Sequence, residues 1–294
     1  MGNGGVVVRR SCSAKAVLPL LLLLCVFLFS SASEGATIYV KEGATGSGGS
    51  WENATGNLKA ALDGATGGDV LWVAKGTYKP HATDREASFV LKSGVELYGG
   101  FNGTESGLEQ RNPAAYPTIL TGNIGDPGNH DDNSYHVVYS SGVDSTAVLD
   151  GFTITGGRAN DNGDQYGKGS GGGMYATGGS PTVRNCIFTA NFALYYGGGM
   201  YNTESSPAVT NCTFSENRAN HGGGMHNYLG SSPTVTNCTF TGNSADYGDG
   251  GGMKNSTSNP TVINCTFTVN SADYGGGMNN YWSGPTVTNC IFWA

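Results

Sequence analysis

Charged residues are scarce in this sequence, and like charges never gather into a run. Only 13% of the 294 residues are Asp, Glu, Lys or Arg, and the formal net charge is −7. A nucleic-acid-binding arm or a polybasic membrane patch needs a cluster of Lys and Arg. The composition therefore argues against nucleic acid as a partner.

Long apolar runs are also missing. The longest, AVLPLLLLLCVFLF at positions 16–29, is shorter than the roughly 20 residues of a transmembrane helix. This stretch follows the basic residues Arg9, Arg10 and Lys15, and the small residues SSAS come directly after it. Such an order is typical of a secretory signal. We predict a signal peptide at 1–33, no membrane span after its removal, and a secreted or cell-surface protein, outer-membrane associated if the host is a diderm bacterium.

Glycine, by contrast, is abundant and recurs at a fixed interval. The chain has 49 glycines among 294 residues, well above the roughly 7% of an average protein. Phrases such as NCTFSENRANHGGGMHN repeat about every 26 residues, with Pro, Val, Phe and Met in step with one cysteine per repeat. The cysteines of this column are Cys186, Cys212, Cys238, Cys265 and Cys290.

Each repeat holds three apolar stretches that are too short and too broken by Gly and Asn for a helix, so they are predicted strands. One such repeat cannot bury its own core, whereas stacked coils can. We therefore predict an all-β fold, a right-handed parallel β-helix of about seven coils, with Val, Cys, Phe and Met inside. Asn tolerates the left-handed region, so Asn185 and its equivalents are expected to turn the corners and to bond from coil to coil.

The repeat pattern also suggests an organisation for the mature chain. Residues 34–160 are expected to form an N-terminal cap, in which NLKAALDGA is a short capping helix, and the first larger coils. Residues 161–294 are expected to form five repeats of about 26 residues. Because the last repeat stops in mid-phrase at Ala294, we expect the carboxy-terminal end to be truncated.

The pairing of GGGM with FTAN, FSEN, FTGN and FTVN resembles the Gly-Gly-x-x and Phe-x-x-Asn tetrapeptides of the polymorphic outer-membrane protein repeats. The leading part, including IYVKEGATGSGGSWENA and LDGFTITGGRA, is similar to the start of bacterial secreted right-handed β-helix repeat proteins. Together these motifs cover nearly the whole mature chain. The resemblance implies a surface or secreted β-helix, and the wider set includes adhesins and relatives of the pectate-lyase superfamily.

Aromatic residues recur on both sides of the glycine runs. Tyr196, His221, Tyr247 and Tyr274 precede successive runs, while Tyr175, Tyr201 and His226 follow the methionine on the outward side of the next strand. Rings stacked along one edge offer apolar faces and hydroxyl groups, which suit an extended glycan. The alternative is that Tyr is a favourable strand residue that shields its neighbours.

Two further sets of residues could bind metal. The acidic side chains of Asp246, Asp249 and Asp273 are expected close together on adjacent coils, where loop carbonyls could complete a calcium site; the alternative is that they form Asx turns. The column of cysteines lacks CxxC spacing and suits disulfide geometry poorly, so buried free thiols are expected. No cofactor other than calcium is expected.

These patterns favour a noncatalytic protein whose partner is an extracellular glycan or a host or cell-surface ligand. The alternative is a polysaccharide-degrading enzyme, a lyase before a hydrolase, in which calcium would acidify a carbon-bound proton and Lys or Arg would remove it. Lys254, Arg218 and Arg184 lie on different coils with no predicted convergence. The compact loops, which leave little room for a catalytic site, argue against catalysis.

Overall fold

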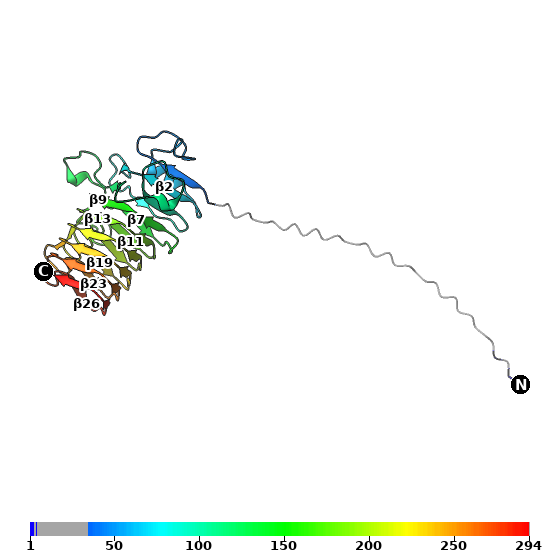
Figure 1. The fold of residues 1–294 in the computed structure, drawn as a ribbon. Helices are drawn as coiled ribbons and strands as arrows, with labels where there is room; N and C mark the ends of the chain where they lie inside the picture. The colour runs from blue at the N-terminus through cyan, green and yellow to red at the C-terminus, as the bar shows by residue number, and fades with distance from the viewer. Residues whose placement is uncertain (3, 5–34, 294) are drawn as a thin grey trace. The chain divides into compact units, whose positions relative to one another are not determined.

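The computed structural model describes residues 1, 2, 4 and 35–293; the predicted signal peptide lies outside the described residues except for its first positions. The chain from residue 35 onward winds into a parallel β-helix, as predicted (Figure 1). Successive turns supply one strand each to three long sheets, and every pairing between strands is parallel. None of the described helices is both long enough and apolar enough to span a membrane.

Sheets A, B and C follow one another along each coil. Sheet A contains β1 (Thr37–Val40), β2 (Val70–Ala74), β5 (Glu96–Phe101), β8 (Val148–Asp150), β12 (Thr182–Arg184), β16 (Ala208–Thr210), β20 (Thr234–Thr236), β24 (Thr261–Ile263) and β27 (Thr286–Thr288). Sheet B contains β3 (Gly76–Tyr78), β6 (Thr118–Thr121), β9 (Phe152–Thr155), β13 (Ile187–Thr189), β17 (Thr213–Ser215), β21 (Thr239–Thr241), β25 (Thr266–Thr268) and β28 (Ile291–Trp293). Sheet C contains β4 (Phe89–Val90), β7 (Val138–Ser141), β11 (Met174–Thr177), β15 (Met200–Thr203), β19 (Met225–Tyr228), β23 (Met253–Ser256) and β26 (Met278–Tyr281).

A fourth, shorter sheet lies between B and C and was not predicted. Its two-residue strands are β10 (Arg158–Ala159), β14 (Phe192–Ala193), β18 (Arg218–Ala219) and β22 (Ser244–Ala245). Segments this short show no readable alternation of apolar and polar residues, which is why the sequence predicts only three strands per repeat.

The predicted columns form the core. Phe188, Phe214, Phe240, Phe267 and Phe292 stack with ring centroids 4.6–4.8 Å apart. Cys212 and Cys238 are each 1% exposed, and the Cys212 N–H donates to Cys238 Sγ at 3.4 Å. All five cysteines of the column are free, and burial raises the pKa of the Cys212 thiol well above its usual value. They act as small apolar fillers, as predicted.

Asparagines turn the corners and link the coils. Asn185, Asn211, Asn237, Asn264 and Asn289 all have φ between 51° and 54°, which confirms the predicted left-handed conformation. Their amides form a ladder in which each Nδ2 donates to Oδ1 of the preceding coil at 2.7–3.3 Å. Asn191, Asn217, Asn243 and Asn270 form a second ladder with bonds of 2.8–3.1 Å, and its first three members are buried. A third ladder, Asn202, Asn227, Asn255 and Asn280, was not predicted, and it is buried except at Asn280.

The glycine runs are required because neighbouring coils approach closely there. Gly222 has φ +66°, a conformation that side chains disfavour. A Cβ on Gly224 would lie 2.5 Å from the carbonyl oxygen of Gly252 in the next coil, and one on Gly223 would lie 2.3 Å from that of Ser244. The repeated GGGM therefore marks where the chain enters sheet C against the following coil.

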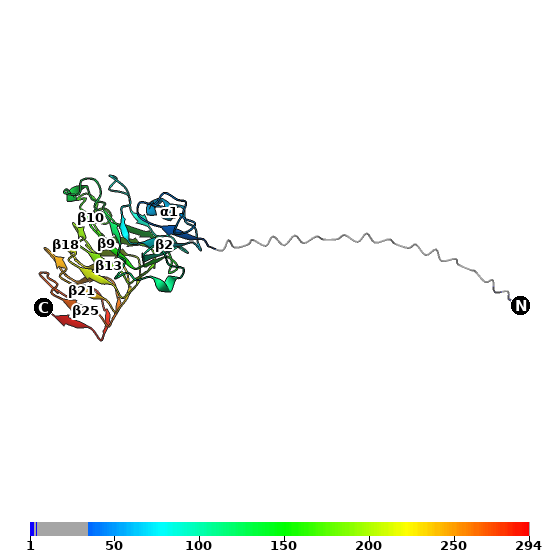
Figure 2. The same ribbon diagram turned by 45° about the horizontal axis from the view of Figure 1, so that its top comes forward.

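The predicted capping helix is α1 (Leu58–Gly64), at the end of the stack opposite the last coil (Figure 2). Asn57 caps it by accepting a hydrogen bond from the Ala60 N–H at 2.9 Å, and Leu58 and Leu62 are buried in the core. The larger first coils carry long insertions: residues 102–117 with the 3-10 helix η1 (Leu108–Gln110), and residues 122–137 with η2 (His130–Asp132). A third insertion, residues 160–173, joins β10 to β11.

Candidate functional site

The outer face of sheet C carries a column of polar and aromatic side chains. Within each strand of the sheet the methionine position points into the core, so the next residue faces outward. Strand register aligns these outward residues, one per coil, in the order Tyr139, Tyr175, Tyr201, His226, Lys254 and Asn279. Two positions further on, Thr203, Tyr228, Ser256 and Tyr281 form a parallel column.

A flanking column comes from the residue that precedes each glycine run. Tyr196 pairs with His221, and Asp249 pairs with Tyr274, in parallel bridges. Tyr247 does not belong to this column, contrary to the prediction. Gly248 and Asp249 are an insertion in that repeat, so Asp249 takes the place beside His221 while Tyr247 projects into solvent, 82% exposed.

The aromatic residues do not form the open ridge that the sequence predicts. Tyr201 is completely buried and His226 is 3% exposed, and the ring of Tyr196 packs against both, with centroids 5.8 and 4.7 Å away. Tyr166 of the insertion 160–173 stacks on Tyr196 and Tyr228, with ring centroids 5.8 and 5.7 Å apart. Its carbonyl oxygen accepts a hydrogen bond from the Tyr175 hydroxyl at 2.5 Å. The insertion therefore turns the face into a walled cleft.

The cleft contains two cavities that contact this insertion. The first has a volume of about 300 Å³ and is lined by Tyr166, Tyr196, His221, His226, Tyr228, Asp249, Lys254, Ser256 and Tyr281. The second has a volume of about 310 Å³ and is lined by Glu86, Ser88, Val90, Tyr135, His136, Tyr139, Asp164, Gly167, Lys168 and Tyr175. Both are thus bordered by aromatic rings and by groups able to form hydrogen bonds.

One ion pair lies within the first cavity. Lys254, whose side chain is only 8% exposed, pairs with Asp249 and donates to Asn279 Oδ1 at 2.8 Å. The Asp249 N–H in turn donates to His221 Nδ1 at 3.3 Å, so this nitrogen carries no proton. The sequence shows no sign of this convergence, because Asp249 reaches the column only through the two-residue insertion.

The two histidines of the first cavity are uncharged near neutral pH. Burial lowers the pKa of His226 well below its usual value and lowers that of His221, an effect to which the charge of Lys254 contributes. Burial also lowers the pKa of His136 to about 4 and raises the pKa of Tyr175 and Tyr196 to about 12. The first cavity therefore offers neutral hydrogen-bonding groups around one internally balanced pair.

The acidic residues predicted to bind calcium are not brought together. Asp246 pairs with Arg218, and Asp249 pairs with Lys254. The Asp273 N–H donates to the Gly248 carbonyl, and its side chain takes part in no ion pair among residues 35–293. Within that range there is no group of three or more His, Cys, Asp or Glu side chains arranged to hold a metal ion.

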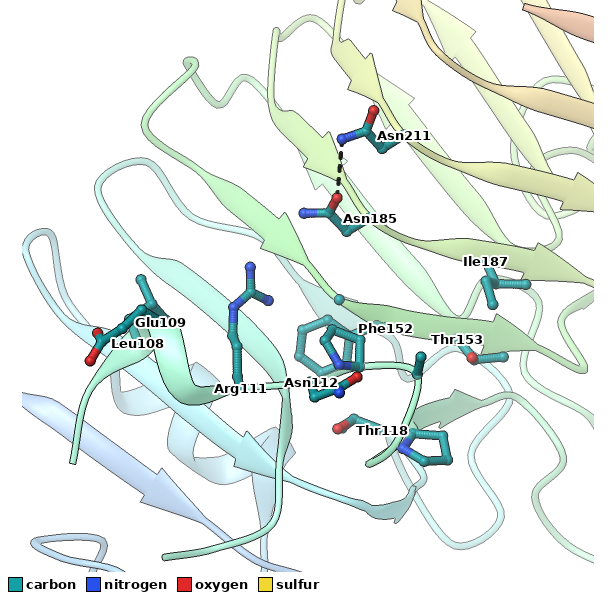
Figure 3. Close-up of a pocket in the computed structure, with 14 residues that line it drawn as sticks. Leu108, Glu109, Arg111, Asn112, Thr118, Phe152, Thr153, Asn185, Ile187 and Asn211 are labelled. Atoms are coloured by element: carbon teal, nitrogen blue, oxygen red, sulfur yellow. Dashed lines mark hydrogen bonds between the residues drawn. The ribbon is translucent and has the colours of Figure 1, made fainter. Parts of the chain in front are cut away.

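A larger cavity, of about 840 Å³, lies elsewhere, under the insertion 102–117 at the corner between sheets A and B. Figure 3 shows Arg111 of this insertion extending toward the Asn185–Asn211 hydrogen bond. Asp150, 1% exposed, accepts from Arg184 Nε at 2.6 Å, Arg111 Nη2 at 2.8 Å and Asn185 Nδ2 at 2.8 Å. The Asp150 carboxylate is thus the last acceptor of the corner ladder. The charged groups at this corner therefore satisfy one another and stabilise the stacking of the coils.

Comparison with known proteins agrees with this architecture. Residues 123–292, more than half of the chain, match the family model described as "Right handed beta helix region". The chain belongs to this family. A search of the curated proteins gave no match.

Among solved structures, a rhamnogalacturonan lyase is similar at 13% sequence identity and a TM-score of 0.33. The alignment covers 88% of this chain and 63% of that one, so the chain spans less than two thirds of the lyase's length.

Proposed function

We propose that this protein is a secreted or cell-surface β-helix that binds a glycan, without catalysis, in the cleft on the outer face of sheet C. The observation that carries the proposal is the register of Tyr139, Tyr175, Tyr201 and His226 on four successive coils, beside two cavities that the insertion 160–173 borders. Aromatic faces pack against the C–H faces of sugars, while nearby polar groups bond their hydroxyls.

The electrostatics of the first cavity favour a ligand with uncharged hydroxyl groups. Lys254 is already neutralised by Asp249, and both histidines there are neutral. A carboxylate-rich polymer would have to compete with Asp249 for the single ammonium group, at a desolvation cost. We therefore expect neutral oligosaccharides to bind more tightly than polyuronates.

A glycan-array screen followed by calorimetric titration of the best oligosaccharide tests the proposal. Tyr166→Ala and Tyr228→Ala each remove a partly exposed ring from the cleft, so affinity should fall between about twofold and tenfold, the range of one aromatic contact. Tyr247→Ala is the matched control, because this ring lies outside the column, and it should bind like the wild type. Equal affinities for the wild type and the three variants would show that the glycan does not bind in the cleft.

The Lys254–Asp249 pair beside His221 favours a second candidate, a polysaccharide-degrading enzyme of the lyase type. Lysine is one of the side chains that can transfer a proton to or from a bound substrate, and this one is only 8% exposed at the wall of the cavity. Release of unsaturated uronate that is abolished in Lys254→Met would support it. Glycan binding without turnover would support the noncatalytic function.

The location is part of the proposal. The basic start, the apolar stretch at 16–29 and the small residues before Glu34 support export. Mass spectrometry of the protein from culture medium or cell surface should find an N-terminus close to Glu34, whereas an intact N-terminus in the cytoplasm would contradict export.

A further inference from the structure

Hydroxyl groups form a regular grid on the outer face of sheet B. In β17, β21 and β25 the middle residue is buried in the core, so its two neighbours face outward. The strand register aligns these neighbours in two columns. The first column is Thr213, Thr239 and Thr266, and the second is Ser215, Thr241 and Thr268. The second column continues to Thr189 and Thr155 on the preceding coils.

The grid lies on a flat part of the sheet. Between the two columns of each strand is a core phenylalanine, which stacks on its equivalent in the next coil. The ring centroids are 4.6–4.8 Å apart, and the ring planes are within 4–5° of parallel. Neighbouring strands of an ordinary sheet are rotated by roughly 20–25°. The coils beneath the grid therefore repeat almost by translation, and the outward side chains repeat at the same interval.

The side chains of the grid are stiff, and most of their hydroxyls are free. Threonine is branched at Cβ, which restricts its rotamers, so its hydroxyl is preorganised. Ser215 Oγ donates to Thr189 Oγ1 at 3.0 Å. The five threonine hydroxyls of the grid form no hydrogen bond with any other residue among 35–293. Each of the five residues is partly exposed, so its hydroxyl is available to water.

The grid carries no charge and lies beyond the insertions. The charged residue next to it in the sequence is Glu216, at the corner that follows Ser215. The cavities under the insertions 102–117 and 122–137 are lined on sheet B by β6, β9 and β13, and by no residue of β17, β21 or β25. A flat partner can therefore approach these three strands.

The outer face of sheet A provides a comparison. Its two outward columns also contain threonines, but Ala208, Arg184 and Ile263 interrupt them. Arg184 is moreover held by the Asp150 carboxylate at 2.6 Å. Sheet A therefore offers isolated hydroxyl pairs, such as Thr234 and Thr236 on β20, where sheet B offers three complete rows.

We propose that the grid on sheet B binds the surface of ice crystals. A flat, uncharged lattice of hydroxyl groups with one fixed repeat complements a crystal better than it complements a curved or ionic partner. The 4.6–4.8 Å repeat of the coils is close to the shortest lattice repeat of hexagonal ice. Waters that bridge hydroxyls of neighbouring coils can thus be shared with the crystal, at a small cost in entropy. The grid and the glycan cleft lie on different sheets, so neither function depends on the other.

Microscopy of a single ice crystal in a solution of the mature protein tests this proposal. The wild type should shape the crystal and separate its freezing temperature from its melting temperature. Thr239→Tyr and Thr241→Tyr should each abolish this gap, because a ring above the grid keeps the ice surface away from the neighbouring hydroxyls. Thr234→Tyr, the matched change on sheet A, and Tyr247→Ala, outside the grid, should retain the gap.

Wild-type protein in which ice grows as it does in buffer would overturn the proposal, and so would a gap that persists in both tyrosine variants of sheet B. Binding to crystalline cellulose in a pull-down, without any gap, would also contradict it. Circular dichroism checks that each variant is folded. Should the tyrosine variants fail to fold, Thr239→Lys replaces them, since its long side chain can reach solvent from this partly exposed position, and it should likewise abolish the gap.

Discussion

Single asparagines carry much of the specificity of this fold. Asn217 is completely buried; its Oδ1 accepts the Asn191 N–H at 3.2 Å, and its Nδ2 donates to the Phe188 carbonyl at 2.8 Å. The exposed Asn211, by contrast, turns a corner and makes side-chain bonds near solvent. The two ladders therefore differ in what a substitution leaves unpaired.

Asn217→Ala should lower the free energy of unfolding by about 3 kcal/mol, because it strands a buried N–H and a buried carbonyl at about 1–3 kcal/mol each. Asn211→Gly keeps the left-handed conformation and should change the free energy of unfolding by less than about 1 kcal/mol. Urea unfolding of both variants measures the difference. Equal losses of unfolding free energy in the two variants would mean that the buried ladder stabilises the fold no more than the exposed one.

The pKa of His136 predicts a pH dependence of stability. Burial lowers this pKa from 6.5 to about 4, and the neutral ring bonds to the Gly171 carbonyl at 3.0 Å. The unfolded chain therefore binds the proton more readily between these values, so stability is full above pH 6.5 and falls toward pH 4, by about 2–3 kcal/mol.

Urea unfolding midpoints at pH 7 and pH 4.5 check this dependence. His136→Gln should flatten it, while His130→Gln, at an exposed position, should retain it. An unchanged slope in His136→Gln would assign the loss to other groups.

At the scale of elements, regular columns were predictable and irregular insertions were not. In the Cys, Phe and Asn columns the same residue type recurs at the equivalent position of each coil, so their stacking can be predicted from the sequence alone. Tyr166 lies in a non-repeating insertion, and nothing in its sequence shows that it packs over Tyr196. Tyr247 was misplaced because two inserted residues shift the register of one coil. The third ladder is not predictable in this way, because Asn202 and its equivalents follow a position where the residue changes from Tyr to His to Lys.

The capping helix α1 was predictable from its amphipathic pattern, and it supports a prediction at this scale. Leu62→Ala should lower the free energy of unfolding by about 2–5 kcal/mol, because the side chain is fully buried at the end of the core. Lys59→Ala, on the outer side of the same helix, should stay within about 0.5 kcal/mol. Thermal unfolding of the two variants distinguishes a true cap from a loosely attached helix, for which both changes would be small.

For the molecule as a whole, the stacking of the coils aligns equivalent residues of the repeats into continuous surfaces. Strand pairing carries sheet C from β4 to β26, so one face presents residues from seven coils in register. The same stacking produces the corner ladder that ends on Asp150. The cleft is distinguished from the other faces by its aromatic lining and by the insertion 160–173 that closes over it.

A crystal structure of the mature protein with its best oligosaccharide from the array tests the central claim most directly. The account predicts sugar density in the cleft of sheet C, in contact with Tyr166, Tyr228 or Tyr175. Density in the cavity beneath Arg111 instead, with the cleft of sheet C empty, would contradict it.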